Sequence, residues 1–119
     1  MAHRITISAG PVTMEAELNE SETAAAIWNE LPITGQANTW GDEIYFRIPV
    51  TLGEAVDARA DVEVGELGYW PSGSAFCIFF GPTPASTGDA PRAASQVNPI
   101  GRVVGDAGAC ALGAVLAHG

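Results

Sequence analysis

The residue types that perform acid–base, nucleophilic or metal chemistry are few in this sequence and are scattered along it. The two histidines, His3 and His118, stand at opposite ends of the 119-residue chain, which disfavours a Ser-His-Asp or Cys-His arrangement. Asp42 and Glu43 form an adjacent carboxylate pair, but neighbouring residues of a strand point to opposite faces of a sheet. Without a bulge, the pair cannot act jointly as acid and base on one substrate.

The two cysteines fall in segments of different character. Cys77 lies in an apolar run, where a free thiol usually behaves as a small hydrophobic side chain, and Cys110 lies in a tail rich in glycine and alanine. Neither a CxxC pair nor a cluster of histidines points to a metal site. We therefore expect two unpaired structural thiols in a reducing compartment, and neither a metal nor another cofactor.

Composition indicates a small acidic protein with one domain, residues 1–119. The chain has 14 Asp and Glu against 5 Arg and no lysine, for a formal net charge of −9. This balance disfavours nucleic acid and anionic membranes as partners, since both are bound through basic surface. Without lysine, Schiff-base catalysis and a G-x-x-x-x-G-K phosphate loop are excluded. The N-terminus lacks the apolar segment of a signal peptide, and no run approaches the roughly 18 apolar residues of a membrane span, so the sequence predicts a cytoplasmic location.

Two stretches, residues 38–50 and 68–86, hold most of the bulky apolar surface. They contain two of the three tryptophans, both tyrosines and all four phenylalanines, next to glycine and proline. Aromatic and β-branched residues favour strands, and glycine and proline mark the turns between them. We expect both stretches to contribute strands to one β core. Trp40 and Trp70 stand beside these turn residues, where an indole either lines a pocket or caps the end of the core.

Alternation within these stretches predicts which side chains point outward. The first stretch divides into two faces, with Ile44, Phe46 and Ile48 on one and Glu43, Tyr45 and Arg47 on the other. If the apolar set fills the core, Tyr45 and Arg47 point outward together. In the second stretch, Phe79 shares the outer face with Cys77, so this strand is apolar on both faces. Such a strand is either covered on both sides or exposes a hydrophobic groove.

The N-terminal third of the chain predicts a hairpin and one helix. Residues 5–8 and 12–18 alternate between apolar and polar side chains, as the two strands of a hairpin do. A capping box over residues 19–22 opens a helix whose apolar face includes Trp28, and Pro32 ends it. We expect Trp28 to cover one end of the core.

The remainder of the chain is predicted to hold further strands at residues 62–64, 67–70 and 100–104, with a long ordered loop over residues 81–99. Tail residues 106–119 either form a helix or supply the last strand of the sheet. If they supply no strand, the sheet keeps an open edge, which is a template for pairing with a second copy. A homodimer is predicted on that condition.

The two aromatic stretches also resemble a known family. Residues 38–46 fit N-T-W-G-[DE]-E-I-Y-F, and residues 68–84 fit G-Y-W-P-x-G-x-A-x-C-x-F-F-G-x-T-P. Both patterns are similar to those of small, largely uncharacterised prokaryotic proteins with a cyclophilin-like β-barrel, and the resemblance spans residues 5–106. It implies a mainly β fold, a small cyclophilin-like β-barrel with one helix plugging an end.

Prolyl cis/trans isomerisation is a reaction that the sequence leaves open, because it needs no nucleophile, metal or cofactor. Its barrier of roughly 18–20 kcal/mol arises from amide resonance. True cyclophilins carry an arginine in a Phe-His-Arg-Ile/Val motif, and residues 45–48, Tyr-Phe-Arg-Ile, are similar in order. The resemblance implies Arg47 as the catalytic residue and Phe79 as its apolar partner. The cyclophilin Phe-Met-x-Gln-Gly-Gly-Asp motif, however, is absent from this sequence. The alternative to a catalytic role is that Arg47 is a surface arginine paired with Glu43 or Asp42.

The leading functional hypothesis is a cyclophilin-like protein that binds a peptide or small ligand on an aromatic surface groove, with weak peptidyl-prolyl isomerase activity as an addition. The residues expected in this groove are Tyr45, Arg47, Phe79, Trp70 and Trp40. The alternative is a non-catalytic structural or assembly barrel, whose aromatic side chains lie in the core or at a dimer seam. Exposure of the aromatic side chains distinguishes the two hypotheses.

Overall fold

The computed structural model describes residues 3–9, 12–104 and 114–118. These residues form one curled sheet of ten strands and a single helix, which confirms the predicted mainly β fold. The elements are β1 (His3–Ala9), β2 (Val12–Leu18), α1 (Glu22–Glu30), β3 (Ile33–Gly35), β4 (Asn38–Trp40), β5 (Glu43–Arg47), β6 (Arg59–Asp61), β7 (Glu66–Trp70), β8 (Ala75–Phe79), β9 (Arg92–Val104) and β10 (Ala114–His118).

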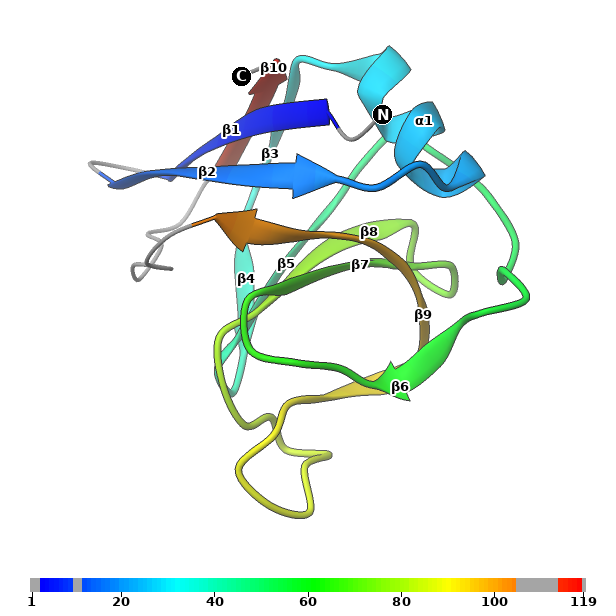
Figure 1. Ribbon diagram of the computed structural model, residues 1–119. Coiled ribbons are helices and arrows are strands. Elements are labelled where there is room, and N and C mark those ends of the chain that lie inside the picture. Colours follow the sequence, from blue (N-terminus) through cyan, green and yellow to red (C-terminus); the bar gives the residue numbers. More distant parts are fainter. Residues whose placement is uncertain (1–2, 10–11, 105–113, 119) are drawn as a thin grey trace.

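The sheet is strongly curled (Figure 1), and the strands at the two ends of its order are β3 and β4. Its strand order is β3-β10-β1-β2-β9-β7-β8-β5-β4, with β6 paired to β9, and neighbouring strands are antiparallel. β3 and β4 stand at opposite ends of this order, yet only Gln36 and Ala37 separate them along the chain. The segment from β3 to β4 pairs with β10 and then with β5, and it thereby brings the two sheet ends together.

The C-terminal segment supplies the last strand of this order. β10 pairs with β1, where Ile5 lies opposite His118, and with β3 on its other side. The predicted last strand is thereby confirmed for residues 114–118, and the helix predicted there is wrong; residues 106–113 lie outside the described part of the chain. The strand prevails because β1 and β3 both offer backbone groups that need partners. The open edge on which the dimer prediction depended is occupied by β10, and the oligomeric state stays a prediction.

The barrel interior is filled by the apolar faces of the strands. Phe46 and Phe76 are fully buried, and their rings stack with centroids 5.4 Å apart. Tyr69 is also fully buried, and its hydroxyl donates to the Val50 carbonyl (2.6 Å) and accepts from the Leu52 backbone N–H (3.1 Å). The face of β5 that was predicted to be apolar, which includes Phe46, is confirmed as part of this core.

Helix α1 covers one end of the barrel, as predicted (Figure 1). Ser21 is its N-cap, and the Ser21 hydroxyl accepts a hydrogen bond from the Ala24 N–H (3.1 Å). Ile27 is fully buried, and Trp28 is half-buried against the same core. At the start of β1, the His3 ring stacks on Trp28 with ring centroids 4.2 Å apart. Within the described residues, no helix has the length and apolar character that a membrane crossing requires.

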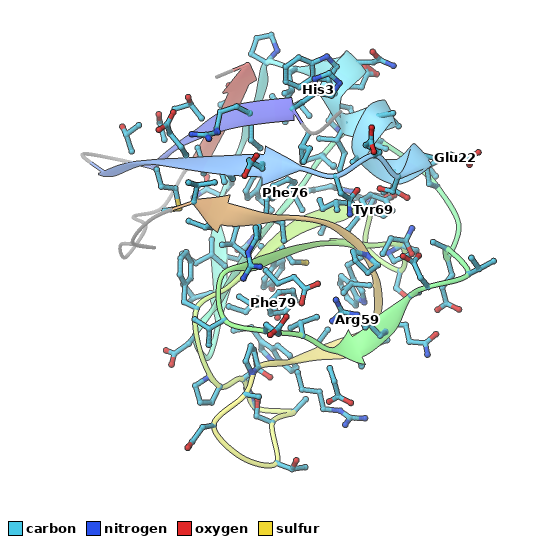
Figure 2. The ribbon with its side chains drawn as sticks, viewed as in Figure 1. His3, Glu22, Arg59, Tyr69, Phe76 and Phe79 are labelled. Carbon is cyan, nitrogen blue, oxygen red and sulfur yellow. The ribbon has the colours of Figure 1, made fainter. Side chains whose placement is uncertain are left out.

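A second, smaller core lies on the outer face of the barrel wall. β9 is 13 residues long and curved: its second half pairs with β7 and β2, and its first half leaves the barrel and pairs with β6 (Figure 1). Figure 2 shows Phe76 and Phe79 on opposite sides of the β7–β8 ribbon, with Phe79 on the side of β6. The second core consists of the buried residues Val62, Ala75, Cys77, Phe79, Ala93 and Val97, with Tyr45 and Trp70 packed against them.

This second layer contradicts two of the sequence predictions. The loop predicted over residues 81–99 ends at Pro91, because β9 begins at Arg92. The strand predicted at residues 62–64 lies three residues earlier, in β6, where it pairs with β9. Both errors have one cause. β6 and the first half of β9 consist mainly of small and charged residues, so each forms a strand by pairing with the other and not through its own propensity.

A bulge lies where β9 bends. Leu67 lies opposite Gly101 and Gly68 lies opposite Pro99, so Ile100 is an extra residue on the β9 side of this pairing. Ile100 is fully buried in the barrel core. A proline is tolerated at a bulge because the ladder is locally interrupted there. The bulge thus allows one continuous strand to serve both the barrel and the layer outside it.

Candidate functional site

A hollow of about 170 Å³ lies on the outer face of the barrel wall, bounded by β4, β5, β7 and β8 and by the first half of β9. We call it the outer pocket. Its walls are largely apolar, with aromatic rings from three strands and one carboxyl group. The residues that line it are Trp40, Glu43, Tyr45, Trp70, Cys77, Ala93, Ala94 and Val97.

Two of the lining side chains, Trp40 and Glu43, flank the turn of the β4–β5 hairpin. They are the last paired residues before this two-residue turn. The turn is fixed to the segment after β8, because the Asp42 N–H donates to the Pro82 carbonyl (2.9 Å) and the Asp42 carbonyl accepts from the Phe80 N–H (2.8 Å). These backbone contacts determine where the indole and the carboxyl group enter the pocket.

Trp70, the last residue of β7, forms another wall of the outer pocket. Its indole N–H donates to the Ser95 hydroxyl on β9 (2.6 Å). The turn after β7 packs against the ring so closely that a Cβ at Gly73 would lie 2.6 Å from Trp70 Cζ3. The ring is held between this turn and β9, and its orientation is thereby fixed.

β8 forms the floor of the outer pocket, and its neighbour β7 pairs with β9. Cys77 reaches the pocket surface, whereas Phe79 is fully buried in the second core. Gly68 on β7 permits the close approach of β9, because a Cβ at Gly68 would lie 2.8 Å from Val97 Cγ2. The floor is therefore apolar and tightly packed.

Glu43 is the one charged residue among those that line the pocket. It is only 6% exposed, and its Oε1 has no hydrogen-bond partner. Burial raises the pKa of Glu43 from 4.5 to about 7, because the ionised carboxylate is poorly solvated, and a hydrogen bond with the Cys77 thiol lowers it by less. A buried polar atom without a partner costs stability. Glu43, which lines the pocket, therefore carries an acceptor oxygen, Oε1, with unused hydrogen-bonding capacity.

Cys77 is a free, buried thiol, as predicted. Its pKa is raised well above the ordinary value by burial, and the neighbouring Glu43 raises it further through its charge and a hydrogen bond. The reactive form of cysteine is the thiolate, so this environment disfavours Cys77 as a nucleophile. Among the described residues, no three His, Cys, Asp or Glu side chains gather as metal ligands do.

Comparison with known proteins identifies the family to which this chain belongs. A family model described as cyclophilin-like matches residues 3–113. The chain belongs to the cyclophilin-like family. The solution structure of the hypothetical protein AF2241 from Archaeoglobus fulgidus is similar to it, with a TM-score of 0.82 and 39% sequence identity over 99% of this chain and 95% of that one. No curated protein matches the sequence significantly. The predicted cyclophilin-like fold is thereby confirmed.

The predicted ligand-binding residues of this cyclophilin-like protein fall into two groups. Trp40, Tyr45 and Trp70 meet in the outer pocket, although they come from three strands. Phe79 lies on the outer side of the barrel wall, as alternation predicted, but the second layer buries it completely. Phe79 is therefore part of the support beneath the pocket and not of its surface.

Arg47 lies at the end of β5, exposed and outside the outer pocket. It shares the outward face of β5 with Tyr45, as the alternation predicted. Among the described residues no carboxylate forms an ion pair with Arg47, so the alternative pairing with Glu43 or Asp42 is not observed. Its catalytic role stays a prediction.

Glu43 and Cys77 are pocket residues that sequence reasoning did not select as functional. The outward direction of both follows from alternation, whereas the burial of Glu43 was not predicted. One signal was available. An outer face that also carries Phe79 must be covered by something, and a carboxylate on that covered face is then removed from water.

Proposed function

We propose that this protein binds a small ligand, or one side chain of a peptide, in the outer pocket. The observation that carries the proposal is a preformed apolar hollow whose walls hold three partly exposed aromatic rings and one buried carboxyl oxygen without a partner. Small-molecule sites are typically concave and apolar, with a few polar groups that orient the ligand. Here Trp40, Tyr45 and Trp70 supply the apolar contact, and Glu43 supplies the polar one.

The size of the outer pocket limits the group that can enter it. A hollow of about 170 Å³ is close in size to an engineered cavity of roughly 150 Å³ that binds benzene. It therefore suits a single ring or a compact branched group. A longer ligand, or a peptide, places one such group in the pocket and the remainder on the surrounding surface.

The alternative function, a purely structural barrel, accounts for some of the aromatic residues but not for all of them. Phe46, Tyr69 and Phe76 are fully buried in the barrel, as the structural hypothesis expects. Trp40 and Trp70 instead remain partly exposed beside a hollow. This exposure favours ligand binding over a role in the core alone.

Blocking the outer pocket is expected to abolish binding without unfolding the protein. Ala94 is exposed and lines the pocket, so Ala94→Phe places a ring at the opening without disturbing the core. In a two-dimensional NMR titration with pyrrolidine amides, phenols and alkylammonium salts, at least one class is expected to shift the indole N–H signals of Trp40 and Trp70. Ala94→Phe is expected to bind that class at least about tenfold more weakly, because the apolar burial of the ligand is lost.

Ala25→Phe is the matched control for this experiment. Ala25 is exposed on α1 and does not line the pocket, so this variant is expected to bind as the wild type does. The proposal is wrong if no class of compound shifts the indole signals of the wild type. It is also wrong if Ala94→Phe binds as tightly as Ala25→Phe.

A second candidate function, weak peptidyl-prolyl isomerase activity, is favoured by the position of Arg47. Arg47 is exposed and lies two residues from Tyr45, on the same face of β5. A cation at this position is suited to stabilise the twisted amide of a bound prolyl peptide. Since Phe79 is buried, the proline ring in this proposal contacts Tyr45 and Trp70 instead.

Replacing Arg47 with alanine is expected to remove most of the isomerase activity. The interaction with the amide is stronger in the twisted transition state than in the planar ground state, so we expect kcat/KM on a proline tetrapeptide to fall at least about tenfold. Arg102→Ala, which removes an exposed arginine from β9, is the control and is expected to keep wild-type activity. Background activity in the wild type, or an equal loss in both variants, rules out this candidate function.

A further inference from the structure

We propose that the group taken up by the outer pocket is an alkylammonium cation, held by the aromatic rings and by the carboxylate of Glu43. This inference rests on the proposed function, because it names the ligand class of the same site. Two independent features support it. One is the convergence of aromatic rings, and the other is a buried carboxyl group with one oxygen, Oε1 of Glu43, that has no hydrogen-bond partner.

The aromatic rings converge on the hollow from three strands. Trp40 ends β4, Tyr45 lies in β5 and Trp70 ends β7, and all three line the pocket. The face of an aromatic ring carries partial negative charge, so rings around a hollow attract a cation, most strongly when tryptophan is present. The alkyl groups of the cation also gain apolar contact, here with Ala93 and Val97. Protein sites for quaternary ammonium groups are built in this way.

Glu43 supplies the matching negative charge. Its side chain is only 6% exposed and its Oε1 has no partner, whereas buried carboxylates are ordinarily paired with a cation. No arginine or histidine lines the pocket to fill this role. An anionic ligand would meet Glu43 without any basic residue to offset the repulsion, and the formal net charge of −9 acts in the same direction. A cation is the ligand class that suits both the rings and the carboxylate.

The elements around the pocket contribute mostly side chains that do not titrate, whereas the pKa of Glu43 lies near neutral pH. β4 and β7 present indole rings and β9 presents alanine and valine side chains, none of which titrates. β8 presents Cys77, whose pKa is raised well above its ordinary value, and β5 itself presents the phenol of Tyr45. Asp42 is exposed, and its carboxylate lies against Gly81. Because burial raises the pKa of Glu43 to about 7, this carboxyl group is partly protonated at neutral pH and ionises when a cation enters.

Binding of a permanent cation is therefore expected to strengthen as the pH rises. With a pKa of about 7, Glu43 is ionised in about a tenth of the molecules at pH 6 and in about nine tenths at pH 8. If the cation binds only the ionised form, its apparent affinity is about tenfold higher at pH 8 than at pH 6. A neutral ligand of the same shape has no such dependence.

The test compares choline with dimethylbutanol, its neutral isostere, in which a tert-butyl carbon replaces the quaternary nitrogen. Affinities are measured by tryptophan fluorescence and NMR at pH 6 and pH 8 for the wild type, Glu43→Gln and the control Asp42→Asn, which removes the adjacent exposed charge. The wild type and the control are expected to bind choline about tenfold more tightly at pH 8 than at pH 6. Glu43→Gln is expected to lose this dependence and to bind choline about tenfold more weakly at pH 8. Equal binding of dimethylbutanol by all three proteins reports that the pocket is intact.

The possible results separate the cation inference from the binding proposal. If dimethylbutanol binds as tightly as choline, or if Glu43→Gln keeps the wild-type affinity for choline, the cation inference is wrong while the pocket remains a binding site. If neither compound binds, and no class of compound in the NMR titration binds either, both proposals fail. A peptide with one trimethylated lysine distinguishes the sources of the cation: tighter binding than choline assigns a peptide, and equal or weaker binding assigns a free amine.

Discussion

Replacing Glu43 with glutamine is expected to stabilise the protein by about 3 kcal/mol at pH 8 and to have little effect at pH 5. In the folded protein, burial raises the pKa of Glu43 from 4.5 to about 7. Between these two values the folded protein binds more protons than the unfolded chain, so the free energy of unfolding of the wild type falls as the pH rises through this window. A difference of about 2.5 between the two pKa values corresponds to about 3 kcal/mol. Glutamine does not ionise, so the variant keeps at pH 8 the stability that the wild type loses.

The measurement is urea unfolding of both proteins at pH 5, 6, 7 and 8. Other carboxylates also contribute to the pH dependence, so the quantity of interest is the difference between variant and wild type at each pH. Asp42→Asn removes a neighbouring exposed carboxylate and, as a surface substitution, is expected to stay within about 0.5 kcal/mol of the wild type. Parallel stability curves for Glu43→Gln and the wild type would mean that Glu43 is solvated in the folded protein.

A carboxylate that destabilises the protein above neutral pH is informative about function. Most of the carboxylates in the described part of the chain are exposed to water, and glutamine at position 43 would avoid the cost of burying a charge. Functional sites commonly retain groups that are unfavourable for stability because the ligand or reaction needs them. The outer pocket combines such a group with a preformed hollow, which is consistent with the proposal that function lies there and not in the barrel core.

The sequence was informative wherever the structural signal is local. The period of two over β5 predicted correctly that Phe46 points into the barrel and Tyr45 points outward. The apolar spacing of α1 and the proline after it predicted the helix and its end. Trp40 and Trp70 were selected because an indole beside turn residues is suited to line a pocket, and both residues line it.

The composition of the outer pocket depends on contacts that no local pattern reveals. Its outer wall is the first half of β9, where Ala93, Ala94 and Ser95 give no strand signal of their own. They lie between Arg92 and Val97, the two positions that pair with the distant β6. This wall belongs to the second core, in which Phe79 is fully buried against Ala93 and Val97. The sequence therefore predicted the outward direction of Phe79 correctly but placed it wrongly in an exposed groove, because exposure is set by pairing across the chain.

Replacing Gly101 with alanine is expected to destabilise the protein by about 3 kcal/mol or more. Gly101 has φ +153°, a conformation that residues with a Cβ rarely adopt, and a Cβ there would lie 1.9 Å from the Glu17 carbonyl oxygen. This oxygen belongs to the backbone of β2, so it cannot move aside without breaking the β2–β9 pairing, in which Gly101 lies opposite Leu18. Strained backbone costs about 1–3 kcal/mol and overpacking costs about as much again. Urea unfolding of the variant and the wild type measures the total loss of stability from backbone strain and overpacking.

Gly53→Ala is the matched control, because a Cβ at Gly53 would meet no atom within 4 Å, and we expect its stability to stay close to that of the wild type. If Gly101→Ala were as stable as Gly53→Ala, β9 could not approach the β2 backbone at Gly101 as closely as the structure shows. The consequence would extend to the candidate site. The residues after the bulge hold β9 in the barrel, and those before it carry Ala93 and Val97 over the outer pocket. Gly101 therefore supports the pocket although it lies outside it, and loss of stability in Gly101→Ala should be accompanied by loss of ligand binding in the fraction that remains folded.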